Sequence, residues 1–146
     1  MRKGRPRYFP QKHRNPPMPP WFNDCPWGIC RWCGHIIWDE TGTILKRRHW
    51  HKECLHEYWI VSDQKYAKAQ VKKRDKGICA SCGKYCHYRW EWDLDHKLPL
   101  IDAHGDINYW KLENCSCKCT GCHLKKTLQE NAERRKKKWT RENSTK

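Results

Sequence analysis

Two Cys-x-x-Cys pairs in the second half of the sequence have the spacing of a metal site. The pairs are Cys79 with Cys82 and Cys119 with Cys122, and 36 residues separate them. Zn²⁺ prefers four soft ligands in a tetrahedron, and four thiolates leave no coordination position open for a substrate. We therefore expect a structural zinc site that joins two distant segments of the chain.

A second set of soft ligands lies nearer the N-terminus. Cys30 and Cys33 form another Cys-x-x-Cys pair, and after 17 residues His51 and Cys54 follow with the same spacing. These four residues are predicted to hold a second structural zinc ion. The choice of its third and fourth ligands stays open, because three further candidates lie close by in the sequence: Cys25, His49 and His56.

Four polar residues lie between or directly after the two Cys-x-x-Cys pairs of the second half: Asp95, His96, Asn114 and His123. Asp95-His96 is followed by Lys-Leu-Pro-Leu, the Asn lies five residues before the last Cys-x-x-Cys, and the second His follows it directly. A lone Asp-His or Cys-His pair is usually a cap, a core group or a zinc ligand. In this order, over about residues 70–130, the motifs together closely resemble the HNH endonuclease family.

The resemblance implies a ββα-metal fold, in which two strands and a helix hold one divalent ion apart from the cysteine-bound zinc. In this pattern His96 is the general base that takes a proton from the attacking water. Asp95 and His123 are expected to bind the catalytic ion, Mg²⁺ or another divalent metal such as Mn²⁺ or Ni²⁺. Asn114 is expected to orient His96 or to complete the metal shell. The implied activity is hydrolysis of DNA phosphodiester bonds.

Positive charge is concentrated at the two ends of the chain. Of the formal net charge of +15, residues 1–20 contribute +6 and residues 131–146 contribute +5, which leaves +4 for the rest. A polyanionic partner fits this distribution, with double-stranded DNA favoured over RNA, although charged ends can also serve solubility alone. Lys125 and Lys126 follow the Cys-x-x-Cys-His motif and are expected to reach the DNA backbone.

Three secondary-structure elements are predicted to position these residues. Alternating apolar and polar residues from Tyr88 to Asp95 predict a half-buried strand that ends at the Asp-His motif. Good helix formers from Asp63 to Arg74, between Ser62 as a cap and Gly77 as a stop, predict a helix. A second helix with a basic distal half is expected from Thr120 to about Lys138.

These elements predict a small, zinc-stapled α+β fold. A chain of 146 residues has room for one compact domain or for two very small modules, each with too thin a core to fold without a staple such as metal. An HNH core would follow a small zinc-binding module and a helix. The expected segments are a basic, proline-rich arm at 1–20, a zinc-binding module at 21–60, a linker helix at 61–76, the nuclease core at 77–130 and a basic tail at 131–146.

The redox state of the eleven cysteines depends on the compartment. No apolar signal segment opens the sequence, so we expect thiols in a reducing cytoplasm, including a host cytoplasm for a phage-encoded protein, rather than disulfides. No apolar run is long enough to cross a bilayer, and the mean hydropathy of −1.15 argues against a membrane partner. Buried free thiols without a further role are expected at three positions: Cys86, Cys115 and Cys117.

Two other functions remain open at this point. A zinc-stabilised module could bind DNA or RNA without cutting it, with the HNH-like residues as remnants. The presence of all four motif residues argues against this alternative. An assembly protein in a phage packaging or other nucleoprotein complex would use the same basic ends and could keep nuclease activity.

Overall fold

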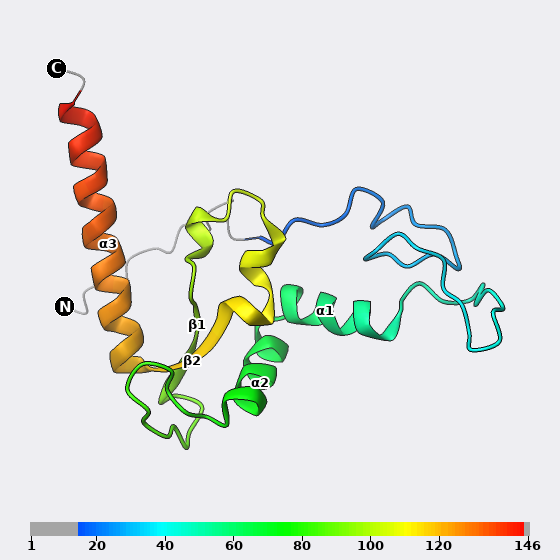
Figure 1. The fold of residues 1–146 in the computed structure, drawn as a ribbon, viewed down its shortest axis with the longest axis horizontal. Helices are drawn as coiled ribbons and strands as arrows, with labels where there is room; N and C mark the ends of the chain where they lie inside the picture. Colours follow the sequence, from blue (N-terminus) through cyan, green and yellow to red (C-terminus); the bar gives the residue numbers. More distant parts are fainter. Residues whose placement is uncertain (1–14, 145–146) are drawn as a thin grey trace, which may run out of the picture.

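The computed structural model describes residues 15–144, so most of the arm expected at 1–20 lies outside the described residues. The helices and strands are α1 (Lys52–Ser62), α2 (Gln64–Asp75), β1 (Trp92–His96), β2 (Cys115–Cys119) and α3 (Thr120–Asn143). In Figure 1 the strands and α2 lie in the middle, α3 lies at one end, and the segment before α1 lies at the other. The described chain is a small, elongated α+β protein.

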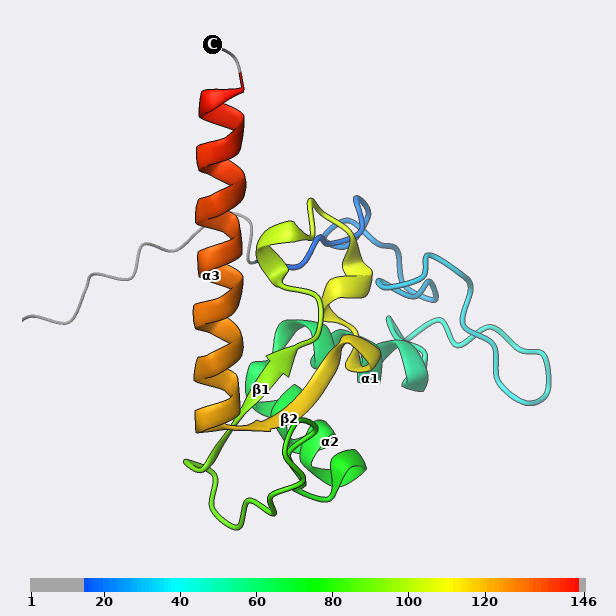
Figure 2. The ribbon, with the colours of Figure 1, turned by 60° about the vertical axis from the view of Figure 1, so that its left-hand side comes forward.

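β1 and β2 pair antiparallel, and the two faces of this small sheet have different neighbours. On one face Trp92 and Leu94 pack against α2 through Val71, which forms the main core. On the other face α3 lies against β1 (Figure 2). Because side chains alternate along a strand, Asp93 and Asp95 share the face that α3 covers. The sheet therefore presents an apolar face to α2 and an acidic face to α3.

β2 is a strand that the hydropathy pattern did not predict. Its Cys115 and Cys117 enter the same core as Cys86, and each of the three is at most 1% exposed. Burial raises the pKa of Cys115 to about 11 and that of Cys117 to about 12, so both are neutral thiols that pack as small apolar side chains. The predicted burial of these three cysteines is confirmed.

A salt-bridged pair at the end of α2 fixes the start of β2. The Arg74 guanidinium donates to the carbonyl oxygens of Leu112 and Cys115 at 2.7 and 2.6 Å, and to the Asp75 carboxylate at 2.6 Å. Asp75 in turn accepts from the backbone N–H of Cys117 at 2.9 Å. The hydrogen bond from Arg74 holds the pKa of Asp75 below its usual value. The pair thereby ties α2 to the strand that leads into α3.

The first strand is shorter than its alternating pattern predicted. β1 begins at Trp92, and the expected start at Tyr88 is wrong. Tyr88 and Trp90 are 56% and 68% exposed, and their rings stack on each other at 4.6 Å between centroids. The two rings pack against each other outside the core, so the alternation of aromatic and polar residues here belongs to a turn and not to a strand.

The segment 61–76, where a single linker helix was expected, contains the end of α1 and all of α2. α2 matches the predicted helix, but its N-cap is Asp63, whose carboxylate accepts from the N–H groups of Lys65 and Tyr66 at 2.8 and 3.1 Å. Ser62 is therefore not the cap; it is the last residue of α1, and its hydroxyl donates to the carbonyl oxygen of Tyr58. α1 runs through the expected segment boundary at 60/61.

The last helix is longer than predicted. α3 continues to Asn143 instead of ending near Lys138, so the described part of the basic tail is helical. Figure 2 shows its second half extending beyond the rest of the protein. No helix within residues 15–144 combines the length and the apolar character that a bilayer crossing requires.

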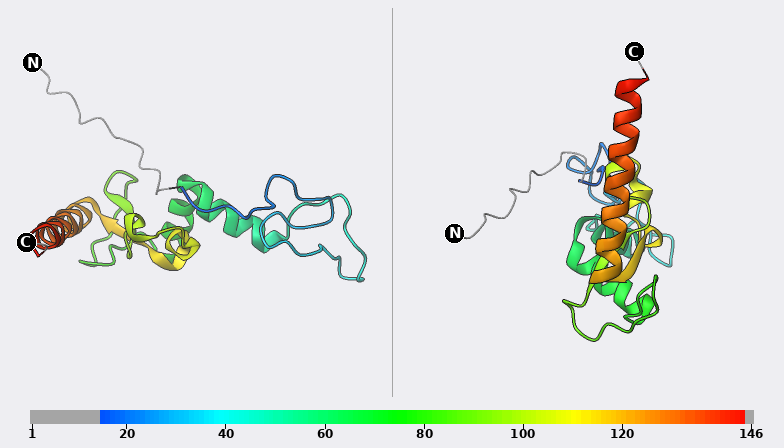
Figure 3. Two further views of the ribbon diagram at one scale, coloured as in Figure 1. Left: turned by 90° about the horizontal axis from the view of Figure 1, so that it is seen from above. Right: turned by 90° about the vertical axis from the view of Figure 1, so that its left-hand side faces the viewer.

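The segment before α1 is joined to the rest of the protein mainly by α1 itself. It contains isolated bridges, Ile29 with Ile36 and Trp38 with Ile44, and extends away from the sheet (Figure 3). Glu57 of α1 accepts a hydrogen bond from the Trp32 indole at 2.9 Å and lies 3.4 Å from the Lys111 ammonium. This carboxylate connects the N-terminal segment to the loop between the strands.

Candidate zinc sites and catalytic cleft

The four cysteines of the predicted second-half zinc site come together. Their sulfur atoms all lie within 4.8 Å of one another, and the Cys82 and Cys119 sulfurs are 3.8 Å apart. Ligands at the Zn–S distance of about 2.3 Å in a tetrahedron would be separated by about 3.8 Å. The cluster therefore fits a zinc ion bound by Cys79, Cys82, Cys119 and Cys122.

The environment of these thiols favours bound metal. Burial raises the pKa of Cys79, but hydrogen bonds from the backbone around the cluster outweigh it and lower that pKa to about 6. Hydrogen bonds with Cys119 and Cys82 raise the pKa of Cys122 to about 12. With four sulfur atoms this close together, full deprotonation requires a cation among them, and Zn²⁺ would supply it.

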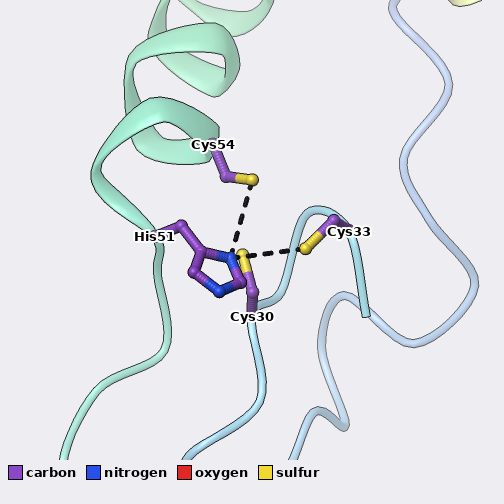
Figure 4. A group of neighbouring side chains, drawn as sticks. All are labelled: Cys30, Cys33, His51 and Cys54. Carbon is purple, nitrogen blue, oxygen red and sulfur yellow. Dashed lines mark hydrogen bonds between the residues drawn. The ribbon is translucent and has the colours of Figure 1, made fainter. Parts of the chain in front are cut away.

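The first predicted set also comes together, as Figure 4 shows. The Nδ1 atom of His51 lies 3.4 Å from the Cys33 sulfur and 3.8 Å from the Cys54 sulfur. A tetrahedral zinc ion would place its nitrogen and sulfur ligands about 3.6 Å apart. His51 Nε2 is 3.2 Å from the carbonyl oxygen of Ile36, to which it can donate its proton, leaving Nδ1 free to bind metal. The set of Cys30, Cys33, His51 and Cys54 fits zinc.

The three alternative ligands have other partners. The Cys25 thiol donates to the carbonyl oxygen of Ile29 at 3.3 Å, and the His49 ring packs on Trp27. His56 Nδ1 is 2.8 Å from the Tyr66 hydroxyl. None of these three residues belongs to the cluster.

Both candidate zinc sites are built on the same plan. The sequence Gly-Ile-Cys-x-x-Cys-Gly occurs at residues 28–34 and again at 77–83, and in each case the last glycine has a positive φ, of 75° and 71°. The other two ligands are the N-cap and the third residue of a helix, α1 in one site and α3 in the other. The positive end of each helix favours thiolates there. This repeated pattern is longer than the Cys-x-x-Cys motif from which the sites were predicted.

Asp95 and His123 lie next to each other between β1 and α3. Asp95 Oδ1 is 3.9 Å from His123 Nε2, and the Asp95 side chain is only 4% exposed. On the other side of the imidazole ring, Nδ1 is 3.4 Å from Asp93 Oδ2. The imidazole of His123 therefore lies between two carboxylates, with Nδ1 toward Asp93 and Nε2 toward Asp95. Asp93 was not selected from the sequence, although strand alternation alone places it on the same face as Asp95.

Two lysines also reach the buried Asp95 carboxylate. Lys126 Nζ lies 2.9 Å from Oδ1 and 3.1 Å from Oδ2, and it also donates to the carbonyl oxygen of His96. Lys118 of β2 lies 3.2 Å from Oδ2. Lys126 was expected to reach outward to DNA, but it points into the protein, whereas Lys125 is exposed. No sequence motif indicated Lys118.

His96 ends β1 beside these groups and is half-buried. Burial lowers the pKa of its imidazole; the nearby positive charge of Lys126 lowers it further, and Asp95 partly opposes both effects. The ring is therefore neutral at neutral pH, the form that can accept a proton.

Asn114 does not contact His96 through any of its side-chain hydrogen bonds. Its amide oxygen accepts from the N–H of Leu98 at 2.8 Å, and its amide nitrogen donates to the carbonyl oxygens of Leu98 and Tyr109 at 3.0 and 2.7 Å. The N–H of Lys97 donates to the Asn114 carbonyl at 2.7 Å. Asn114 therefore holds the backbone of the two residues that follow His96 and has no direct hydrogen bond to the imidazole.

A cleft of about 690 Å³ opens at these residues. Asp95, His96 and His123 all line it, together with apolar side chains such as Leu94 and Trp110. One face of α3 forms a polar wall with helical spacing, made of His123, Lys126, Thr127, Glu130, Asn131 and Arg134. The cleft thus combines acidic, basic and imidazole groups in one opening.

Comparisons with known proteins give two partial similarities. The chain is 24% identical over 136 residues to DNA annealing helicase and endonuclease ZRANB3 of Mus musculus, and 22% identical over 141 residues to the Homo sapiens protein of the same name. These alignments cover 66% and 70% of the chain but only 12% of either relative. No protein-family model and no solved structure matches the chain.

Proposed function

We propose that the chain is a metal-dependent DNA endonuclease of the HNH type. The observation that carries this proposal is the convergence of Asp95, His96 and His123 on one cleft, where two antiparallel strands meet a helix. Their order in the sequence matches the HNH pattern, because Asn114 lies between His96 and His123 and a Cys-x-x-Cys pair directly precedes His123. A structural zinc cluster alone would not require these groups in one opening.

In this proposal His96 is the general base, because a neutral, half-buried imidazole in the cleft can take a proton from an attacking water. Asp95 and His123 hold the divalent ion, which when bound would polarise the scissile phosphate. Their Oδ1 and Nε2 atoms are 3.9 Å apart, whereas adjacent ligands of an octahedral ion are separated by about 3 Å. A shift of about 1 Å in two side chains would close this difference.

Two further residues position this site. Asp93 would keep the His123 ring in the tautomer whose Nε2 can bind metal, the usual role of a carboxylate behind a ligating histidine. Asn114 would hold the backbone after His96, which fixes the direction of the imidazole. Both roles are indirect, so we assign them to positioning rather than to catalysis.

DNA as the substrate has two supports. Both relatives carry a name that describes action on DNA, including endonuclease activity. The chain also has a net charge of +15, and α3 carries a run of five basic residues at 134–138, the first of which lines the cleft. A basic helix next to the cleft would contact the phosphate backbone without reading sequence.

A cleavage assay with a base-deficient variant tests the proposal. Supercoiled plasmid is incubated with zinc-loaded protein and Mg²⁺, Mn²⁺, Ni²⁺ or EDTA, for the wild type and for His96→Ala. We expect cleavage by the wild type with a divalent ion and a loss of about 10²- to 10⁴-fold in His96→Ala, because a general base typically contributes that much. His104→Ala is a matched control, since His104 lies in an exposed turn between the strands.

Zinc content, circular dichroism and DNA affinity should be nearly the same in both variants and the wild type. Equal cleavage by His96→Ala and wild type in metal-controlled buffer would remove the catalytic assignment. The protein would then be a zinc-stabilised module that binds nucleic acid without cutting it.

A further inference from the structure

The contacts around Asp95 point to a role for Lys126 that no motif assigned. Its ammonium lies 2.9 and 3.1 Å from the two Asp95 oxygens and also donates to the His96 carbonyl oxygen. It thus contacts the carboxylate proposed to bind the ion and the backbone of the proposed base. The side chain of Lys126 is only 21% exposed, so water screens this charge weakly.

We propose that Lys126 is a resident counter-cation that competes with the catalytic divalent ion for Asp95. This inference rests on the proposed function, because it concerns the ion held by Asp95 and His123. The Lys126 ammonium touches Oδ1, the same oxygen that faces His123 Nε2. A divalent ion bound between these two atoms would lie within a few ångströms of the ammonium, and like charges at that distance repel strongly.

The structure also provides a second partner for the displaced ammonium. Glu130 lies one turn further along α3, and its Oε1 is 3.2 Å from Lys126 Nζ. Lys126 can therefore leave Asp95 by a small rotation while keeping an ion pair. Lys118 remains 3.2 Å from Asp95 Oδ2 and would keep the buried carboxylate paired when Lys126 is replaced.

Binding of Mn²⁺ to zinc-loaded protein, measured from the EPR signal of the free ion, tests this competition. Lys126→Gln keeps a hydrogen-bond donor without the charge, and Lys126→Met keeps the length without either. Both should bind Mn²⁺ about tenfold to a hundredfold more tightly than the wild type, because a contact between charged groups no longer has to be broken. Lys126→Arg should bind like the wild type. Lys125→Gln is the matched control for removal of a charge on the exposed side and should change affinity little.

The sign of the effect separates competition from a structural role. If Lys126 merely supported the fold, its loss would leave Mn²⁺ affinity unchanged or weaken it, and this result in a folded Lys126→Gln protein with full zinc content would overturn the inference. The proposed function fails differently: neither the wild type nor Lys126→Gln would then bind Mn²⁺ in a manner abolished by Asp95→Asn. That outcome would overturn both conclusions, whereas unchanged affinity at an Asp95-dependent site would overturn only the role of Lys126.

Discussion

Replacing Asn114 by alanine should destabilise the protein by an amount that its contacts allow to be worked out. The side chain is 8% exposed and makes three hydrogen bonds to the backbone, one accepted and two donated. Asn114→Ala leaves the N–H of Leu98 and the carbonyls of Leu98 and Tyr109 without these partners. At about 1 kcal/mol for each bond, the expected loss is about 3 kcal/mol of unfolding free energy.

A thermal melt of zinc-loaded protein measures this loss. For a protein of this size the expected loss corresponds to a fall in Tm of about 10 °C. Asn114→Asp, of the same shape, should be at least as destabilising at neutral pH, because it turns a carboxylate oxygen toward the carbonyls of Leu98 and Tyr109. Asn108→Ala is the matched control: Asn108 is exposed in the same loop, and its amide nitrogen donates only to the Asp106 side chain. Its Tm should change little.

Cleavage should fall along with stability in Asn114→Ala, even well below the melting temperature, because the backbone after His96 is no longer fixed. Zinc content should stay at the wild-type level, since none of the zinc ligands contacts Asn114 through its side-chain hydrogen bonds. A Tm within about 2 °C of the wild type would refute the reasoning, because it would mean that these three bonds contribute almost nothing.

Three further measurements test the metal sites and the basic helix. Elemental analysis should find two zinc ions per chain, and finding one or none would rule out one or both sites. Chelation or Cys122→Ala should unfold the part of the protein that contains β1, β2 and the start of α3, since structural zinc contributes roughly 10–16 kcal/mol in small modules. His123→Ala should lose cleavage activity, and a high Mn²⁺ concentration should partly restore it, because this variant lacks a ligand of the ion and not the general base. Restoration of His96→Ala to the same degree would contradict this assignment. Deleting residues 134–146 should make DNA binding less sensitive to salt. The slope of log K against log salt should fall by about 0.9 for each phosphate that the shortened protein no longer neutralises. An unaltered slope would show that this part of α3 does not touch DNA.

Both candidate zinc sites could be predicted from the sequence, because their spacing is a local property. Two cysteines separated by two residues can bind the same ion in any fold. Cys30 with Cys33 and Cys79 with Cys82 can therefore be recognised from the sequence alone. Helix α2 could also be predicted from the sequence, because most of its residues are good helix formers. The shared Gly-Ile-Cys-x-x-Cys-Gly pattern was also present in the sequence, and comparing the flanking glycines would have revealed it.

The extent of the two strands could not be predicted from the sequence. Tyr88 and Trp90 alternate with polar residues as a strand would, but their rings stack on each other outside the core. Cys115 and Cys117 were correctly expected to be buried, but the hydropathy pattern did not predict the strand on which they lie. A contact between two neighbouring rings decided the first case, and the pairing of β2 with the distant β1 decided the second.

The surroundings of Asp95 depended most on the tertiary structure. The sequence determined that Asp93 and Asp95 share a face of β1, because side chains alternate along any strand. It could not determine that α3 would turn His123 and Lys126 toward that face, since a helix with polar residues on all sides has no preferred buried stripe. The packing of α3 against β1 decided it. The cysteine cluster at the start of α3 holds one end of the helix close to Cys79 and Cys82, and the ion pair of Lys126 with the buried Asp95 carboxylate fixes its rotation.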